Sequence, residues 1–172
     1  APLSGPNVEI DTLIVPGGWG VNAACKDDAL VGWVRRRAGE TRRTASVCSG
    51  AFLLATAGLL DGRKVVPHWQ RCAEFAERFP DVRLDPDPIF VRDGNVWTSA
   101  GVTAGIDLAL ALVADDHGQQ LSAGVARELV VYFRRAGGQA QFSAPLALQA
   151  TEREPLRDLL EWIVEHPAAD LS

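Results

Sequence analysis

A short β-type run, a cysteine between small residues and an entirely apolar helix pattern follow one another in residues 44–60. The run is Thr44 to Val47, and the helix pattern covers residues 49–60 (SGAFLLATAGLL). A helix that is hydrophobic on all sides must be buried. A strand that leads directly into such a helix is typical of an α/β fold, in which helices pack on a sheet. We therefore expect Cys48 to stand on a sharp strand-to-helix turn.

The same alternation of strand and helix patterns continues along the chain. Residues 8–15 (VEIDTLIV) predict a buried parallel strand that stops at the loop 16–18 (PGG). Asp93-Gly94 between the β-type runs 89–91 and 96–98 predicts an antiparallel hairpin. The further elements expected are a strand at 63–66 and helices at 27–39, 67–79, 101–115, 121–135 and 154–166. The pattern predicts a mostly parallel sheet with helices on both faces and a β-hairpin insertion.

Composition restricts the possible classes of protein. The 172 residues are 47% hydrophobic, which suits one ordinary core. No leader peptide or membrane-length apolar run occurs. Three cysteines without a CxxC pair favour neither a disulfide framework nor a zinc site. A net charge of -5 is the wrong sign for gripping DNA unaided. We expect a cytoplasmic domain with no membrane partner.

The segment around Cys48 has the pattern of a nucleophile elbow. Ser46 and Gly50, two places to either side, are small, as a strained turn requires. A thiol at a helix start lies at the positive end of the helix dipole, which favours the thiolate. The Ser49 amide and one from the Gly17-Gly18 loop would then stabilise an oxyanion. The alternative is that Cys48 is a small buried hydrophobic residue, as free cysteines usually are.

Other polar and aromatic residues can be assigned only provisional roles. His68 follows a strand and a proline, so it could reach the same pocket as base or hydrogen-bond donor. A helix-start histidine bonded to backbone is an equally open interpretation. Trp19 could form a pocket wall. His68 and Cys72 have metal-ligand spacing but no third ligand, so we predict no metal site. Asp107 is either on the thin polar side of its helix, which we expect, or a buried carboxylate with a partner.

Five segments together resemble a known family. They are DTLIVPGG (11–18), SVCSGAFLLATAGLLDGR (46–63), PHW (67–69), TSAGVTAGIDLALAL (98–112) and VARELVVYFRRAGGQAQFS (125–143). On these segments the chain is similar to the ThiJ/PfpI superfamily, which is class I glutamine amidotransferase-like. More narrowly, it resembles the amino-terminal domain of GlxA-type transcriptional regulators of the AraC family. The resemblance implies a flavodoxin-like three-layer sandwich.

The resemblance also implies a domain organisation and a function. Residues 1–150 would form the ThiJ/PfpI-like domain without its first strand region, and residues 151–172 the linker and first helix of a truncated DNA-binding domain. DNA would be contacted only through a domain missing from this chain, and the domain would form a homodimer. A small-molecule effector would bind in a pocket lined by the residues Gly17, Gly18, Trp19, Cys48, Ser49 and His68.

An enzymatic alternative rests on the same segments. Ser49-Gly50 and Pro67-His68-Trp69 also resemble isonitrile hydratases, which implies a cysteine-dependent hydratase or amidase with Cys48 and His68 as catalytic residues. Two departures limit what the superfamily resemblance implies about catalysis. Many peptidase-like members have histidine where this chain has Ser49. The enzymes commonly pair the cysteine with an acid from a first strand region that this chain lacks. The segment GGQAQFS (137–143), followed by what resembles the start of a DNA-binding module, favours a sensor, and we expect no cofactor.

Overall fold

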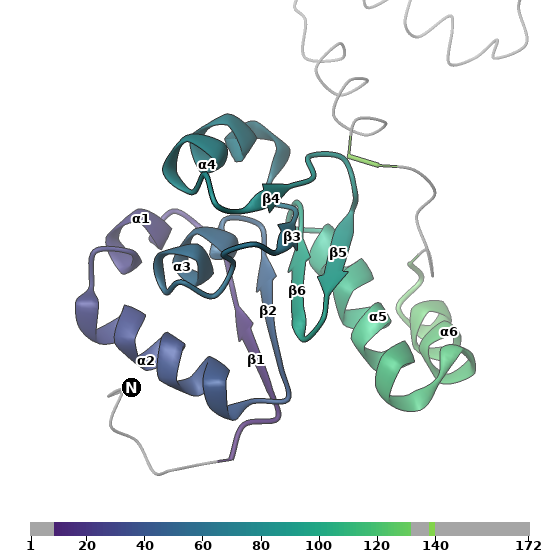
Figure 1. Cartoon of the computed structure of the whole chain (residues 1–172). Coiled ribbons are helices and arrows are strands. Elements are labelled where there is room, and N and C mark those ends of the chain that lie inside the picture. Colours follow the sequence, from purple (N-terminus) through teal and green to yellow (C-terminus); the bar gives the residue numbers. More distant parts are fainter. Residues whose placement is uncertain (1–8, 132–137, 140–172) are drawn as a thin grey trace, which may run out of the picture. The chain divides into compact units, whose positions relative to one another are not determined.

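The computed structural model describes residues 9–131 and 138–139 (Figure 1). Contacts between residues divide the chain into two units, 1–137 and 138–172, and every element below lies in the first. The helix expected at 154–166 and the domain boundary expected near residue 150 lie outside the described residues. Both therefore remain predictions.

A four-stranded sheet forms the middle of the first unit, in the order β1-β2-β6-β5. Its strands are β1 (Thr12–Val15), β2 (Arg43–Val47), β6 (Val96–Ser99) and β5 (Phe90–Asp93). β2 is parallel to both β1 and β6, whereas β5 is antiparallel to β6. The predicted hairpin is confirmed, and its second strand is itself an inner strand of the sheet. The hairpin thereby extends the parallel sheet by one edge strand.

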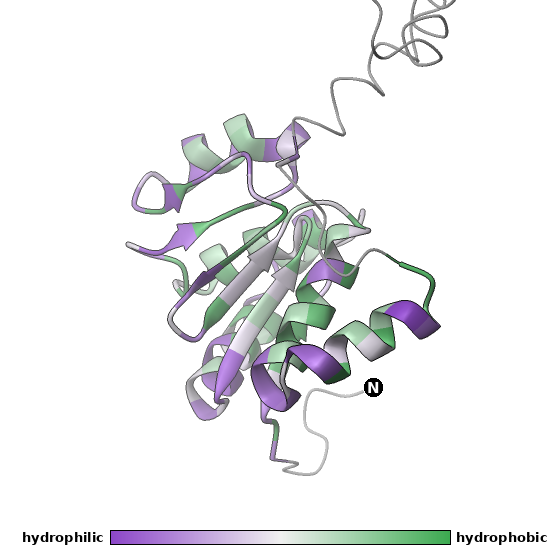
Figure 2. Cartoon of the chain, turned by 90° about the vertical axis from the view of Figure 1, so that its right-hand side faces the viewer, coloured by the Kyte–Doolittle hydropathy of each residue, from purple (hydrophilic) through white to green (hydrophobic). Residues whose placement is uncertain are grey.

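Helices cover both faces of this sheet, as Figure 1 shows. On one side lie α1 (Val21–Ala24), α2 (Asp28–Glu40) and α3 (Gly50–Thr56). On the other lie α5 (Ala104–His117) and α6 (Gln119–Glu128). The predicted three-layer α/β architecture is confirmed. In Figure 2 the central strands are white to green along most of their length, and hydrophilic residues lie mainly on the helices and at strand ends.

The largest core cluster lies between the sheet and the first group of helices. Leu13 and Val15 of β1 point into it, whereas Ile14 between them is exposed, which is the alternation expected of a strand. Phe52 and Leu54 of α3 are fully buried in the same cluster. The all-apolar helix pattern was therefore a correct signal of burial.

A smaller subdomain follows α3. β3 (Lys64–Val65) and β4 (Arg83–Leu84) form a separate two-stranded parallel sheet. Between them the 3-10 turn η1 (Trp69–Arg71) leads into α4 (Cys72–Arg78), where one continuous helix was expected. β4 was not predicted at all, because a two-residue strand carries no readable alternation.

Asp107 contradicts the sequence-based expectation. Its helix α5 packs on the sheet, and the residue is buried, with 8% of its surface exposed. It takes part in an interaction, as a buried carboxylate must. The expectation of an exposed polar side was wrong, because α6 packs against α5 and covers part of the surface that the isolated helix pattern left open.

Candidate functional site

The predicted turn at Cys48 is present. Cys48 joins the end of β2 to the start of α3, and its φ of 56° lies in the left-handed region that non-glycine residues avoid. Its backbone N–H donates to the carbonyl oxygen of Ser99 at 2.8 Å, which ties the turn to the neighbouring strand β6. Such a conformation costs about 1–2 kcal/mol and must be held by the surrounding structure. The elbow is thus a strained position fixed by the sheet.

The loop after β1 presses directly on this elbow. A Cβ atom on Gly17 would stand 2.8 Å from the Ser49 nitrogen, and one on Gly50 would collide with the Val15 carbonyl oxygen. Real Cβ atoms do not approach so closely, so both positions require glycine. The small residues around Cys48 therefore allow two backbone segments to touch.

The Ser49 side chain binds the backbone of the glycine loop. The Gly18 N–H donates to Ser49 Oγ at 3.0 Å, and the Ser49 side chain is buried. We expected the Gly18 amide to be an oxyanion donor directed at the pocket. In the structure it donates to the serine hydroxyl instead, in a partly buried hydrogen bond. The oxyanion pair that the sequence suggested therefore has at most its Ser49 amide free.

His68 lies at the start of η1 and combines both interpretations that the sequence left open. Its Nδ1 accepts a hydrogen bond from the Gln70 N–H at 3.3 Å, so it caps the turn. Its ring stacks beside that of Trp69, with centroids 5.8 Å apart. Burial lowers the pKa of His68. The ring also faces Gly101, where an added Cβ would stand 3.6 Å from His68 Cδ2.

A cavity of about 680 Å³ joins these groups. It is lined by all six residues predicted from the sequence, namely Gly17, Gly18, Trp19, Cys48, Ser49 and His68. Trp19 is fully exposed, so it stands at the rim and is not a buried wall. The cavity opens where β1, β2 and β6 end, the position at which open α/β sheets bind ligands. The structure therefore brings the predicted residues together at one edge of the sheet.

The polar wall of the cavity was missed by sequence reasoning. Arg71 donates through Nε and Nη2 to the two carboxylate oxygens of Glu74 at 2.9 and 2.8 Å, and through Nη2 to Asn22 Oδ1 at 3.1 Å. Its guanidinium lies 3.9 Å from the centroid of the Phe52 ring. These ion pairs lower the pKa of Glu74. The i, i+3 spacing of Arg71 and Glu74 beside the PHW segment was the only signal that could have indicated this wall.

Cys72 does not belong to the cavity. Its Sγ–H donates to the His68 carbonyl oxygen at 3.6 Å, and burial raises the pKa of the thiol. Within residues 9–131 and 138–139, no group of three His, Cys, Asp or Glu side chains could hold a metal ion. No helix in this part of the chain is long and apolar enough to cross a membrane.

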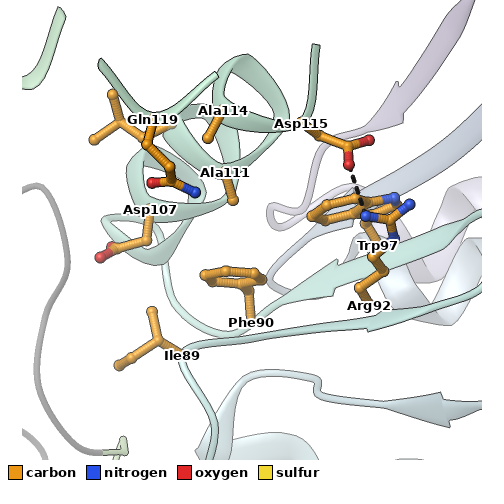
Figure 3. Close-up of a pocket in the computed structure, with 10 residues that line it drawn as sticks. Ile89, Phe90, Arg92, Trp97, Asp107, Ala111, Ala114, Asp115 and Gln119 are labelled. Atoms are coloured by element: carbon orange, nitrogen blue, oxygen red, sulfur yellow. Dashed lines mark hydrogen bonds and ion pairs between the residues drawn. The ribbon is translucent and has the colours of Figure 1, made fainter. Parts of the chain in front are cut away.

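A second cavity, of about 580 Å³, lies between the hairpin and helices α5 and α6 (Figure 3). The Phe90 ring faces Ala111 of α5, and Arg92 lies over the Trp97 ring at 4.6 Å while pairing with Asp115 at 2.7 Å. None of the site residues predicted from the sequence lines it. It is therefore separate from the cavity at Cys48.

Comparisons with known proteins agree with this architecture. Residues 6–115 match the model of the DJ-1/PfpI family. The HTH-type transcriptional regulator GbdR of Pseudomonas aeruginosa is 35% identical over 162 residues, which are 92% of this chain and 43% of the regulator. Isonitrile hydratase of Pseudomonas putida is 38% identical over 108 residues, 62% of this chain and 45% of the enzyme. Further relatives are also named HTH-type transcriptional regulators.

A solved structure supports the same fold. The crystal structure of a ThiJ/PfpI family protein from Pseudomonas syringae superposes with a TM-score of 0.67 at 30% identity, covering 95% of this chain and 64% of that one. The predicted flavodoxin-like fold class is confirmed. This chain spans less than half the length of the regulator and the enzyme that it matches.

Proposed function

Because this chain belongs to the DJ-1/PfpI family, we propose that it is the ligand-sensing domain of an AraC-type transcriptional regulator. The observation that carries the proposal is the 35% identity to an HTH-type regulator over 92% of the chain. The effector is a small molecule that binds in the cavity at Cys48, with Gly17, Gly18, Trp19, Ser49 and His68 as lining residues.

The form of the cavity supports this role. Its volume of about 680 Å³ is within the range of about 300–1,000 Å³ common for small-molecule sites. It combines apolar rim residues with a few fixed polar groups, which is how such sites achieve orientation and specificity. The ion pair of Arg71 with Glu74 gives one wall a fixed shape before any ligand arrives.

The proposal extends to partners and location. The domain forms a homodimer, and DNA binding is the task of a separate helix-turn-helix domain, since a net charge of -5 does not suit phosphate contacts. A cytoplasmic location fits the free thiols of Cys25, Cys48 and Cys72.

The test is transcription from a reporter promoter under control of the full-length parent regulator, across a panel of carbon and nitrogen sources. Asn22→Phe inserts a ring into the cavity from an exposed position on α1, and Cys48→Ala removes the thiol. Both should abolish or strongly shift the inducing response. Cys25→Ala is the matched control, because Cys25 is a partly buried cysteine outside the cavity. A normal response in both cavity variants, or a parent gene without a helix-turn-helix region, would contradict the proposal.

A second candidate is a cysteine-dependent hydratase, favoured by the strained Cys48 elbow and the 38% identity to isonitrile hydratase. In this hypothesis the Cys48 sulfur adds to the ligand carbon and His68 moves a proton. The engaged Gly18 amide weighs against it, because the developing anion would lack its second donor. The assay is conversion of an isonitrile and water to the N-substituted formamide. Turnover by the wild-type protein that is lost in Cys48→Ala would favour the enzyme over the sensor.

A further inference from the structure

The two ring nitrogens of His68 have different environments. Nδ1 accepts the Gln70 N–H at 3.3 Å, and only an unprotonated nitrogen can accept a hydrogen bond. A neutral imidazole with a free electron pair at Nδ1 carries its proton at Nε2. The capping bond therefore selects one tautomer of the ring. The lowered pKa of His68 is consistent with a neutral ring near pH 7.

The protonated nitrogen lies on the side of the ring that meets Gly101. An added Cβ on Gly101 would stand 3.7 Å from Nε2, in ordinary van der Waals contact. Among the described residues, no side chain or carbonyl accepts a hydrogen bond from Nε2, and none links His68 to Cys48. Stacking on Trp69 restricts the plane of the ring. His68 is thus a lining residue of the cavity whose Nε2 donor is unused among the described residues.

The wall formed by Arg71 and Glu74 has the same chemical character. Arg71 uses Nε and Nη2 for Glu74 and Asn22, and in the part of the chain that the structure describes its Nη1 bonds to no other side chain. Glu74, the acidic residue in the lining, is already bound by Arg71 and Arg78. Among these lining residues, His68 and Arg71 therefore have N–H donors to offer, whereas the carboxylate of Glu74 already binds two arginines.

From this arrangement we propose that His68 is a neutral hydrogen-bond donor through Nε2 and that the ligand is a small carbonyl or carboxylate compound whose oxygen it binds. This deepens the proposed function and rests on the cavity being the ligand site. It excludes His68 as the base that deprotonates Cys48, because the one nitrogen able to accept a proton caps η1. His68 and Cys48 both line the cavity in which this ligand would bind.

The tautomer can be tested without any ligand. The chain has three histidines, so nitrogen-15-labelled protein should give three separable imidazole spin systems, and His68→Gln identifies the one lost. We expect His68 to be neutral and protonated at Nε2 at pH 7. A ring protonated at Nδ1, or a doubly protonated ring, would overturn the proposal.

The donor role can be tested with small alkylating probes of Cys48. Iodoacetamide presents a carbonyl acceptor, whereas iodoethane has none; in both reactions the sulfur bonds to carbon and iodide leaves. His68→Phe should slow alkylation by iodoacetamide about threefold to tenfold, the loss of one hydrogen bond, and leave iodoethane unchanged. His68→Gln, which keeps an N–H donor, should restore most of the rate. Peptide mass spectrometry follows Cys48, with Cys25 as the internal control.

The outcomes distinguish the donor role of His68 from a role in forming the Cys48 thiolate, and they test the sensor function separately. Equal slowing of both reagents in His68→Phe would mean that the histidine promotes thiolate formation, which refutes the donor role. No slowing with either reagent also refutes it. The alkylation test could confirm the donor role while the reporter assay shows a normal response in Asn22→Phe and Cys48→Ala. That combination would reject the sensor function and keep the assignment of His68.

Discussion

The two edges of the central sheet use polar residues in opposite ways. One is the amino edge, where the parallel strands β1 and β2 begin. There Arg42 and Arg43 pair with Asp11, Asp115 and Asp116 in a continuous network. At the carboxyl edge, Cys48 and His68 line an open cavity, and neither side chain has an ionic partner there among the described residues. The first edge satisfies its charges within the chain, whereas the second holds a thiol and an imidazole that line a cavity.

Removing the centre of the amino-edge network should have the largest effect. Arg43 is 6% exposed and binds both Asp115 and Asp116, so Arg43→Met leaves two neighbouring carboxylates without their buried partner. We expect a loss of about 2–4 kcal/mol in the free energy of unfolding by urea. Arg83→Met is the control, because Arg83 is largely exposed in its pair with Asp93 and should matter little. Equal effects would mean that burial of Arg43 does not matter.

At the carboxyl edge, Gly50→Ala should destabilise by about 1–3 kcal/mol, because its methyl group would collide with the backbone after β1. The matched control is Gly124→Ala in α6, where the same methyl group meets no atom and should stabilise the helix by about 0.5–1 kcal/mol. Both glycines are helical, so opposite signs in urea unfolding isolate the close contact. Stabilisation by both substitutions would contradict the packing described for the elbow.

Relief of strain at Cys48 should give a smaller effect. Glycine adopts a φ of 56° without penalty, so Cys48→Gly should be more stable than Cys48→Ala by about 1 kcal/mol. The comparison between the two variants removes the loss of the thiol from the difference. Thermal unfolding of both proteins measures it, and a Cys48→Ala protein equal to or more stable than Cys48→Gly would argue against strain at this turn.

The smallest effect on stability should come from low pH, which weakens the ion pairs of the amino edge. Hydrogen bonds from Arg42 and Thr12 lower the pKa of Asp11 to about 2, and Arg43 lowers that of Asp116. Carboxylates with depressed pKa values contribute stability above their unfolded pKa, and this is lost as pH falls through the folded value. The urea concentration at the unfolding midpoint should therefore decrease as the pH is lowered from about 4 to about 2. This decrease should be smaller in Asp11→Asn. An unchanged slope in that variant would show that the Asp11 pair contributes nothing.

Local patterns predicted the parts of the fold that local sequence determines. The turn at Cys48 and the hairpin at Asp93-Gly94 each depend on a few adjacent residues, and both are present. The bond from Gly18 to Ser49 joins residues 31 positions apart, and the contact of Arg71 with Asn22 joins residues 49 apart. Such contacts arise only when the layers assemble, which is why the contact of Arg71 with Asn22 and the engaged amide could not be predicted.

One hydroxyl group also has an evolutionary consequence. The Gly18 amide is held by Ser49 and not by the backbone, so a single codon change at position 49 to a residue without a hydroxyl releases it. Within one unchanged scaffold, one mutational step can therefore change which acceptor the Gly18 amide meets. The side chain at position 49 thereby sets how many backbone donors the loop after β1 has free.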